Sequence, residues 1–302
     1  MQKITLGSRG SELARTQTAM VAEALKRAWP ELEIVLEIIK TRGDERKAEP
    51  LYPRARRKGL FTGEIERALE AGEIDVAVHS AKDLPSDTTL GLELVAVLPR
   101  ASVEDVWISK ESNLGPNGLV ATGSVRRQYQ LRRKQPGIEL ADLRGNVPTR
   151  LRKLVTGEWN AIVLARAGVE RLGYDLSRGS FDFEGVNLRV EVLATDDFLP
   201  AGGQGVIAMQ VRSNDDKART IVRVINDDET LVCLEAEREF LRLLQGDCDS
   251  PVGVLATISS SRMTVRAQVF EPRRIEPRMA CVEGGASSGK ELARELWEAI
   301  NG

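Results

Sequence analysis

The segments that decide the fold read VATGSVRR at residues 120–127, IELADLRGN at 138–146 and AIVLARAG at 161–168. Each begins with a short apolar run typical of a buried strand and continues into polar, helix-forming sequence. Arginine follows each apolar run: Arg126 and Arg127, Arg144, and Arg171. Ligands of open α/β sheets bind beyond the carboxyl ends of the strands. The repetition therefore predicts a pocket for a substrate with several carboxylates or phosphates.

The first of these junctions shows the chemistry most clearly. A helix over 125–134, stopped by Pro136 and Gly137, would direct its unpaired amides and positive dipole end beyond the strand. Arg126 and Arg127 add planar, permanently charged groups that suit two-oxygen anions. For any single arginine, a solvated position or a pairing with one of the many acids is the commoner arrangement. Repetition at successive strand ends favours the pocket.

Composition sets limits on the class of protein. The chain has 302 residues, enough for two or three domains, and its 29% charged and 42% hydrophobic residues are ordinary for a globular protein. The net charge of -2 argues against a general nucleic-acid role. No stretch approaches the roughly 20 apolar residues of a membrane span, and no export signal stands out, so we expect a cytoplasmic protein without membrane or nucleic-acid partners.

The pattern of short apolar runs and amphipathic segments predicts an α/β chain throughout. Strands are expected at 4–6, 34–40, 74–78, 94–98, 120–124, 138–142, 161–165, 206–211, 254–258 and 263–270. Helices are expected at 12–28, 61–71, 125–134, 229–244 and after Ser288. The basic stretch from Thr41 to Lys58 lacks periodicity, so it fits a mobile flap over the pocket and a disordered surface loop equally well.

The chain crosses into a second α/β unit near residues 99–105 and returns through the glycine-rich turn 199–205. We therefore predict three domains: 1–101 together with 200–222, then 102–199, then 223–302.

Two further motifs suggest chemistry. Lys82 and Asp83 follow a predicted buried strand, where a cation beside a carboxylate suits binding or proton transfer, although such pairs also occur by chance. His79, the only histidine, fits a hydrogen-bonded structural residue better than a general acid or base.

The cysteines differ in their surroundings. Cys233, Cys248 and Cys281 are odd in number and lack metal-ligand spacing, which makes a disulfide framework or a metal site improbable. Cys233 fits a packed helical position, whereas Cys248 lies in the turn QGDCDSPVG at 245–253, where a thiol can react. The adjacent Asp247 and Asp249 raise a thiol pKa, and no second histidine is available for a Cys-His couple. Covalent attachment of a prosthetic group fits this turn better than acyl-transfer chemistry.

Taken together, these motifs resemble the porphobilinogen deaminase family, also called hydroxymethylbilane synthases. The resemblance runs over nearly the whole chain: GSRGSELARTQ at 7–17, TRGD at 41–44, KGLF at 58–61, HSAKD at 79–83, GSVRR at 123–127, LRGN at 143–146, QG at 204–205 and CDSPVG at 248–253. Several independent motifs in one order make a chance match improbable.

The resemblance implies a transferase of tetrapyrrole, porphyrin and heme biosynthesis. Such an enzyme joins four porphobilinogen molecules head to tail with loss of ammonia, then releases the linear tetrapyrrole hydroxymethylbilane by hydrolysis. It implies a dipyrromethane cofactor that is held by Cys248 and primes the chain, and a catalytic Asp83 that stabilises a cationic intermediate. It also implies a cytoplasmic monomer without a metal.

The implied fold has two domains that resemble type II periplasmic-binding-protein lobes around a cleft. The third is a small α/β domain that carries the cofactor cysteine. Residues expected to hold the acetate and propionate groups of cofactor and substrate are Arg9, Ser11, Gln17, Lys58, Ser80, Lys82, Thr122, Ser124, Arg126, Arg127, Arg144, Asn146, Arg150, Arg171 and Gln204.

The chain departs from the family pattern at four places. Asp247 stands where glycine usually precedes the attachment cysteine, and Gly123 where a second serine is common. Arg166 replaces a small apolar residue, and the loop PRARRK at 53–58 is unusually basic. Asp83 and Cys248 are both present, so activity is expected.

Two rival functions remain at this stage. A non-catalytic binding protein for a small polyanion would explain the arginines, but not the reactive cysteine turn. A nucleic-acid-binding protein would use residues 126–134 and the basic loop, but the net charge of -2 and an aromatic content of 4% give it little support.

Overall fold

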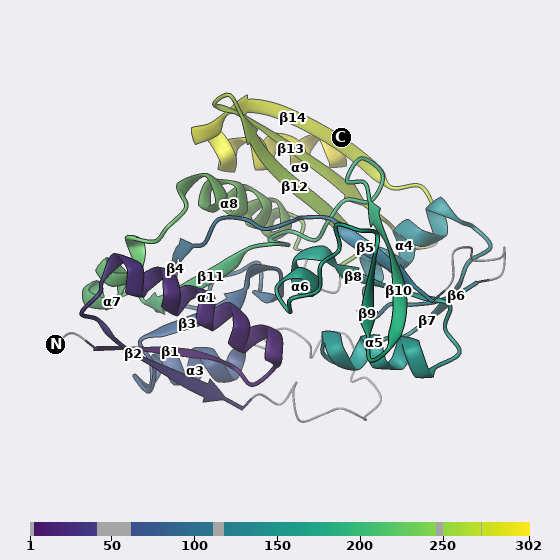
Figure 1. Cartoon of the computed structure of the whole chain (residues 1–302). Coiled ribbons are helices and arrows are strands. Elements are labelled where there is room, and N and C mark those ends of the chain that lie inside the picture. Colours follow the sequence, from purple (N-terminus) through teal and green to yellow (C-terminus); the bar gives the residue numbers. More distant parts are fainter. Residues whose placement is uncertain (1–2, 41–61, 111–117, 246–249, 273) are drawn as a thin grey trace.

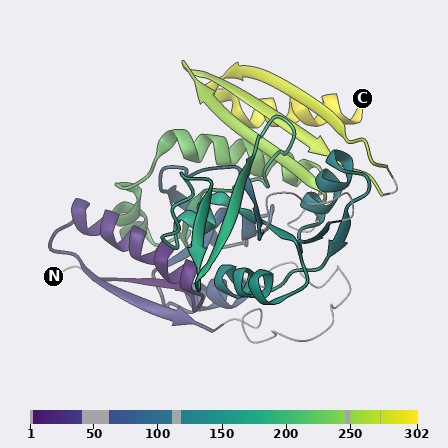
Figure 2. The ribbon, with the colours of Figure 1, turned by 45° about the vertical axis from the view of Figure 1, so that its right-hand side comes forward.

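The computed structural model describes residues 3–40, 62–110, 118–245, 250–272 and 274–302. The described chain forms two α/β lobes that lie side by side and a third, smaller unit that lies across them (Figure 1). The view in Figure 2, turned by 45°, shows the same arrangement. The fold class is therefore α/β, as the sequence predicts.

The first lobe is built on a five-stranded sheet with strand order β2-β1-β3-β11-β4. Its elements are β1 (Lys3–Arg9), α1 (Glu12–Ala28), β2 (Glu33–Ile39), α3 (Gly63–Glu70), β3 (Val76–Ser80), the 3-10 turn η2 (Ala81–Asp83), β4 (Leu92–Val97), β11 (Ile207–Arg212) and α7 (Asp216–Arg223). Strands β1, β2 and β3 are parallel, and β11 runs antiparallel between β3 and β4.

Helix α1 shows how local sequence sets an element. The Ser11 side chain accepts a hydrogen bond from the Ala14 amide, and Glu12 in the first turn and Lys26 with Arg27 in the last complement the helix dipole. The helix ends at Trp29, the residue before Pro30, because proline cannot continue it.

The second lobe is built on a six-stranded sheet with strand order β7-β6-β8-β5-β10-β9. Its elements are β5 (Asp105–Ser109), β6 (Leu119–Ala121), α4 (Val125–Lys134), β7 (Glu139–Ala141), α5 (Val147–Thr156), β8 (Ala161–Ala165), α6 (Arg166–Glu170), β9 (Ser180–Phe183) and β10 (Val186–Leu193). Strands β6, β7 and β8 are parallel, and β5 runs antiparallel between β8 and β10.

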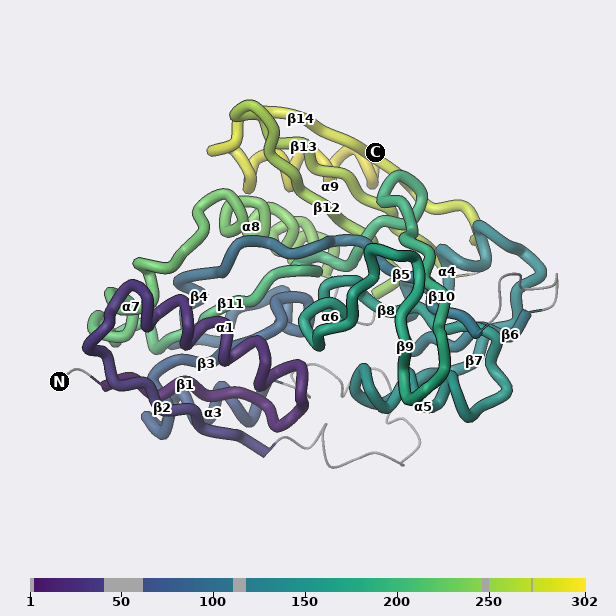
Figure 3. The backbone as a smooth tube through the Cα atoms, in the orientation of Figure 1, coloured from purple at the N-terminus to yellow at the C-terminus, as the bar shows by residue number. Residues whose placement is uncertain are grey.

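The two sheets share one plan. In each, three parallel strands are followed by an antiparallel strand that the chain supplies as it crosses between lobes: β11 in the first sheet and β5 in the second. The tube in Figure 3 follows both crossings, from β4 to β5 and from β10 to β11. Because β11 starts opposite the end of β3 and β5 starts opposite the end of β8, the ends of these parallel strands lie next to the crossings.

The third unit is an antiparallel sheet covered by two helices. Its elements are α8 (Asp228–Leu243), β12 (Val252–Ser259), β13 (Arg262–Val269), β14 (Arg278–Gly285), the 3-10 turn η3 (Ala286–Ser288) and α9 (Gly289–Asn301). Inward residues of the sheet and of both helices form one apolar core that includes Phe240, Val254, Val265 and Leu296. This core is distinct from those of the two large sheets, but Leu234 of α8 also packs in a second buried cluster with Ala81 and Val206 of the first lobe. The third unit is therefore packed directly against that lobe.

Most expected elements are found, some with shifted ends. The strand expected at 74–78 is wrong in its boundaries: β3 begins at Val76 and continues through His79 to Ser80. Strands β5, β9, β10 and β14 and helix α7 were not predicted, and no range was predicted for helices α5 and α6. The basic stretch 41–58 falls within 41–61, outside the described residues. Among the residues that the structure does describe, no helix is both long enough and apolar enough to cross a membrane.

Candidate functional site

The predicted site residues gather where parallel strands of both lobes end. In the first lobe, β1 ends at Arg9 and β3 leads through Ser80 into the turn that carries Lys82 and Asp83. In the second lobe, β6, β7 and β8 lead respectively to Thr122, Asp142 and Arg166. Polar residues therefore follow the ends of parallel strands in both lobes, and their role in binding a ligand stays a prediction.

The Lys82-Asp83 turn is held by its backbone. The Ala81 amide donates to Val206 O at 3.0 Å, and the Leu84 amide donates back to Ala81 O at 3.1 Å. On the preceding strand, the Ser80 hydroxyl donates to Gln17 Oε1 at 2.9 Å, which connects α1 to the end of β3. Gln17 is itself buried, so this contact has a defined geometry.

Positive charge dominates the surroundings of Asp83. The pKa of Lys82 is lowered to about 8, by burial first and then by the positive charge of Arg127, while Asp83 and Asp105 oppose the shift. Burial, then Arg127, lowers the pKa of Arg150 to about 10, again opposed by Asp83. Three cations thus share an electrostatic environment with one half-buried carboxylate. Such a site attracts anionic groups.

Arg126 and Arg127 are less free than their sequence position suggests. Arg126 Nη2 donates to Asp105 Oδ2 at 2.8 Å, and Arg127 Nη2 donates to Asp105 Oδ1 at 2.7 Å. Arg126 Nη1 also donates to Gln130 and to Leu199 O. Asp105, with 0% exposure, is thus a shared counter-ion for two buried guanidiniums.

Asp105 is the residue that the sequence analysis missed. Burial alone would raise the pKa of its carboxyl, but the two guanidiniums and a hydrogen bond from Gln204 outweigh burial and hold that pKa far below its usual range. Gln204 Nε2 donates to Asp105 Oδ1 at 2.9 Å and to Val103 O at 2.7 Å. The amide nitrogen of Gln204, a predicted ligand-binding residue, thus binds the crossing segment. The sequence feature that could have pointed to Asp105 is its position as an acid directly before the apolar run at 106–108.

Several buried polar atoms in this region have no protein partner: Nε of Arg126, Nε of Arg127, Nε of Arg171 and Oε1 of Gln204. Arg171 also donates from Nη2 to Gly205 O at 2.7 Å, and burial lowers its pKa to about 10. Donors that lack acceptors in a cationic region fit a carboxylate-rich ligand, because each acetate or propionate would supply acceptor oxygens. A dipyrromethane with its side-chain carboxylates is of this kind.

Other predicted residues cap elements at the strand ends. Ser124 caps α4 through the Arg127 amide, and Thr122 Oγ1 accepts from the Ser124 amide at 3.3 Å. Asn146 caps α5 through the Thr149 amide at 3.0 Å. Each side chain thus shapes a helix N-terminus.

The arginines around α5 differ in exposure. Arg150 Nε donates to Gly145 O at 2.6 Å. Arg144 is exposed and pairs with Asp142 at 2.7 Å. Arg144 is therefore the most accessible of the predicted arginines in this lobe.

His79 and the described cysteines match the structural interpretation. His79 Nε2 lies 3.2 Å from Gln210 Oε1. Burial lowers the pKa of His79 to about 4, opposed by that hydrogen bond and reinforced by Arg238 and Arg9, so its ring is neutral near pH 7. Cys233 is buried, and burial followed by Glu237 raises its pKa to about 12; Cys281 is exposed.

Two of the departures from the family pattern have structural reasons. A Cβ at Gly123 would lie 2.6 Å from the Leu143 carbonyl oxygen, so this backbone leaves no room for a second serine. Arg166 Nε donates to Glu170 Oε1 at 2.7 Å, and its Nη1 lies 3.6 Å from Glu104. Arg166 therefore ties α6 to the crossing segment.

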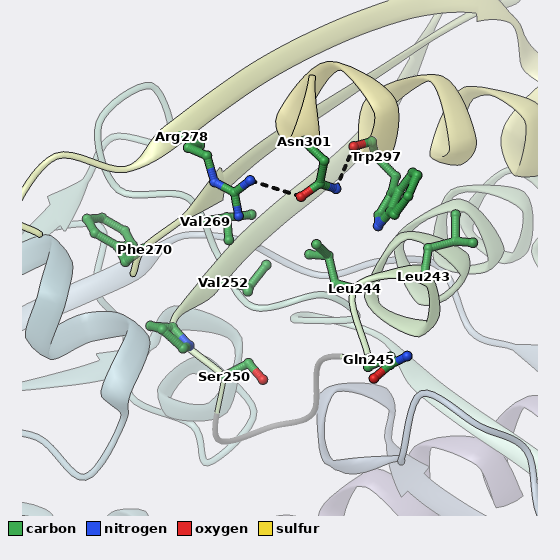
Figure 4. A pocket seen from close by; sticks show the side chains of 11 residues that line it. Leu243, Leu244, Gln245, Ser250, Val252, Val269, Phe270, Arg278, Trp297 and Asn301 are labelled. Atoms are coloured by element: carbon green, nitrogen blue, oxygen red, sulfur yellow. Dashed lines mark hydrogen bonds between the residues drawn. The ribbon is translucent and has the colours of Figure 1, made fainter. Parts of the chain in front are cut away.

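Lys58, Cys248, Asp247 and the 53–58 loop lie outside the described residues. Gln245 and Ser250, on either side of 246–249, line a half-open cavity of about 400 Å³ together with Phe270, Trp297 and Arg278 (Figure 4). Arg278 Nη1 donates to Asn301 Oδ1 at 2.9 Å. The cavity belongs to the third unit and does not include the Lys82-Asp83 turn. In the described part of the chain, no group of three or more His, Cys, Asp and Glu side chains is arranged to hold a metal.

The chain matches two family models. Residues 4–220 match the model described as porphobilinogen deaminase, dipyromethane cofactor binding domain, and residues 231–298 match porphobilinogen deaminase, C-terminal domain. The chain is 42% identical to the porphobilinogen deaminase of Nitrobacter hamburgensis, covering 97% of this chain and 92% of that one. It is 39% identical to the enzyme of Moorella thermoacetica, covering 98% and 93%.

Among solved structures, the methionine-binding protein MetQ aligns with a TM-score of 0.43 and 12% identity over 76% of this chain and 92% of that chain. The family models and the relatives span both lobes and the third unit. The chain therefore belongs to the porphobilinogen deaminase family.

Proposed function

We propose that this chain is a working hydroxymethylbilane synthase. It condenses four porphobilinogen molecules head to tail with loss of ammonia at each step, and it releases the linear tetrapyrrole hydroxymethylbilane by hydrolysis. This is a transferase reaction of tetrapyrrole biosynthesis, and we assign it to the heme branch. A binding protein without catalysis is not favoured, because relatives named for the enzyme match over nearly the full chain.

The single observation that supports this proposal is the cationic setting of Asp83. Lys82 and Arg150, whose lowered pKa values follow from burial and then from the positive charge of Arg127, both interact electrostatically with this carboxylate. The cations suit the two carboxylates of each pyrrole unit. The Asp83 carboxylate is negatively charged, so it can stabilise the cation that forms when ammonia leaves. An oriented carboxylate stabilises such a cation without being consumed.

The cofactor is assigned to Cys248. The thiol would hold a dipyrromethane through a thioether, and when bound this group supplies the acceptor end to which the first substrate is joined. The carboxylates of the cofactor would meet Lys82, Arg127, Arg150 and Arg171. The unpartnered Nε atoms of Arg127 and Arg171 support this assignment. The turn from 246 to 249 lies outside the described residues.

The remaining members of the proposed binding set fall into two groups by their contacts. Side chains at helix starts and strand ends would contact the growing product: Arg9, Ser11, Gln17, Ser80, Thr122, Ser124, Arg144 and Asn146. Arg126 and Gln204 would act through Asp105, since their described hydrogen bonds go to that carboxylate and to the crossing backbone. Lys58 completes the set by resemblance alone.

We further propose three domains, at 1–101 with 200–222, 102–199 and 223–302, in a cytoplasmic monomer. The separate cores of the two sheets and of the third unit support the division. Gel filtration with light scattering tests the monomer.

Turnover tests the proposal directly. Purified protein is incubated with porphobilinogen, and ammonia release and linear tetrapyrrole are measured together; a ratio near four to one is expected from the reaction. Asp83→Asn should abolish both while it leaves the fold and the bound pigment unchanged. Glu139→Gln, which changes an exposed carboxylate on β7 of the second lobe, is the matched control. Normal turnover in Asp83→Asn would refute the assigned role.

A further inference from the structure

Glu237 is a fully buried carboxylate at the junction of three chain segments. It lies on α8 of the third unit with 0% exposure. Its Oε1 accepts from Arg100 Nη1 at 2.7 Å and from the Ala256 amide at 2.8 Å. Its Oε2 accepts from the Gly203 amide at 2.6 Å and from Arg100 Nη2 at 3.2 Å. Every hydrogen bond of this carboxylate is thus made to protein.

Gly203, one of these partners, lies directly against the turn that carries Lys82 and Asp83. A Cβ on Gly203 would lie 3.0 Å from Ala81 C and 3.0 Å from the Lys82 amide nitrogen. The residue has a φ of +74°, in the left-handed region that favours glycine. The contact is therefore between two backbones, with no flexible side chain to absorb a displacement.

The same short segment binds the turn a second time. The Val206 amide donates to Gly203 O at 3.1 Å, and Val206 O accepts from the Ala81 amide at 3.0 Å. Arg100 Nε also donates to Gln204 O at 3.0 Å. Glu237 and its partner Arg100 thus hold Gly203 and Gln204, the first two residues of the glycine turn that supports Ala81.

We propose that Glu237 is a positioning residue: from the third unit, and through Gly203, it sets the place of the Asp83 carboxylate for catalysis. It touches neither substrate nor cofactor in this account. The inference rests on the proposed function, in which Asp83 acts during ammonia loss. The third unit would thus control the position of the Asp83 carboxylate through the hydrogen bonds of Glu237 and the backbone contact between Gly203 and Ala81.

The chemistry favours a specific geometry over simple adhesion. A buried ion pair contributes little net stability compared with apolar packing, so Glu237 with Arg100 is poorly explained as adhesion alone. Each oxygen of Glu237 accepts one guanidinium N–H from Arg100 and one backbone N–H. These four bonds together allow a single arrangement of α8, β12 and the crossing segments. Small displacements of catalytic groups have large kinetic effects, and an error of about 1 Å can cost about a hundredfold in rate.

The test compares two variants that disturb the series of contacts from Glu237 to Ala81, one at each end. Glu237→Gln places an amide NH₂ where one oxygen now accepts, so either Gly203 or Ala256 loses its acceptor. Gly203→Ala leaves Glu237 unchanged and presses a methyl group on the Ala81 backbone. We expect kcat to fall at least tenfold in both, with KM within threefold of the parent and pigment loading retained.

Two control variants separate positioning from general loosening of the interface. Arg266→Ala removes the 2.7 Å bond to Asp196 and the contact with Thr195, which join β13 of the third unit to the chain before Gly203 and involve neither Arg100 nor Gly203. Glu235→Gln changes an exposed carboxylate on α8, the helix that carries Glu237. Both should retain the parental kcat, including where Arg266→Ala lowers the melting temperature.

Amide exchange measured by mass spectrometry gives a readout that does not depend on turnover. The peptide over residues 76–84 should exchange faster in Glu237→Gln and in Gly203→Ala than in the parent, and unchanged in both controls. Parental kcat and parental exchange in Gly203→Ala would overturn the proposal, even if Glu237→Gln fails to fold. A fall in kcat that follows melting temperature across all four variants would also overturn it. If the parent itself does not consume porphobilinogen, the proposed function fails, and exchange still decides whether the link exists.

Discussion

Replacing Asp105 with asparagine tests the electrostatic arrangement at the lobe crossing. The carboxylate has 0% exposure and accepts hydrogen bonds from Arg127 at 2.7 Å, Arg126 at 2.8 Å and Gln204 at 2.9 Å. Asn keeps the shape but leaves two buried guanidiniums without a counter-ion. Breaking a buried pair by removing one partner costs about 3–5 kcal/mol, and we expect Asp105→Asn to lose that much free energy of unfolding.

A surface pair of equal length provides the comparison. Arg266 Nη1 donates to Asp196 Oδ1 at 2.7 Å, but the Asp196 side chain is 86% exposed. Exposed pairs contribute about 0–1 kcal/mol, so Asp196→Asn should change stability by less than about 1 kcal/mol. Urea denaturation followed by circular dichroism measures both, with the midpoints compared at constant slope. Equal losses in the two variants would refute the argument that burial decides the difference.

The pH dependence of the free energy of unfolding tests the role of Asp105 independently. The folded-state pKa of Asp105 is far below its unfolded value, which is about 4. A depressed carboxyl pKa stabilises the protein above the unfolded pKa, and that contribution is lost as pH falls toward the folded pKa. The parent should therefore lose more stability than Asp105→Asn when the pH is lowered from about 5 to about 2. Parallel curves would contradict the assignment.

Three further outcomes are expected. Since burial and then Arg127 lower the pKa of Lys82 to about 8, kcat/KM should decline above that pH, and Lys82→Arg should move the decline upward; an unmoved profile would exclude Lys82 as its cause. His79 is the only histidine, so its ring carbons give one set of NMR signals, which should not titrate between pH 8 and pH 5; a midpoint near 6.5 would show a solvated ring. Iodoacetamide at pH 8 should label the exposed Cys281 and spare Cys233, whose pKa is raised to about 12; labelling of both thiols at equal rates in the folded protein would be inconsistent with that burial.

Local sequence was sufficient for elements whose own residues determine their ends. Helix α1 has its bounds as expected, because Ser11 caps it and Pro30 stops it. The predicted strand at 161–165 also has its observed bounds, since its five residues are all buried and apolar. In such segments one face or both faces are apolar along the whole length, so the pattern needs no tertiary context.

The missed strands depend on pairing with distant segments. In β14, half-buried positions alternate with exposed ones and no residue is fully buried, and the strand forms because it lies along β13 as the edge of the third sheet. Strand β5 enters the second sheet antiparallel between β8 and β10, which only the crossing of the chain decides. Propensity within such segments is weak, and packing against neighbours determines their structure.

The candidate site likewise combines positions that local sequence reveals with contacts that depend on tertiary structure. The positions of Lys82, Asp83 and the arginines follow from strand ends, which sequence reveals. The counter-ion Asp105 is 21 and 22 residues from its partners Arg126 and Arg127, and it meets them because β5 joins the second sheet. Glu237 meets Gly203 from a third unit altogether. Pairings of this kind depend on the relative placement of sheets, which no local pattern specifies.

The central claim is that the chain carries a covalent dipyrromethane on Cys248 and extends it. The most direct measurement is the denatured intact mass of freshly purified protein with peptide mapping of Cys248, repeated after incubation with porphobilinogen. The account predicts a mass excess of two linked pyrrole units on that peptide, with Cys248→Ser unmodified. An unmodified Cys248 peptide before and after incubation, with no porphobilinogen consumed, would contradict it.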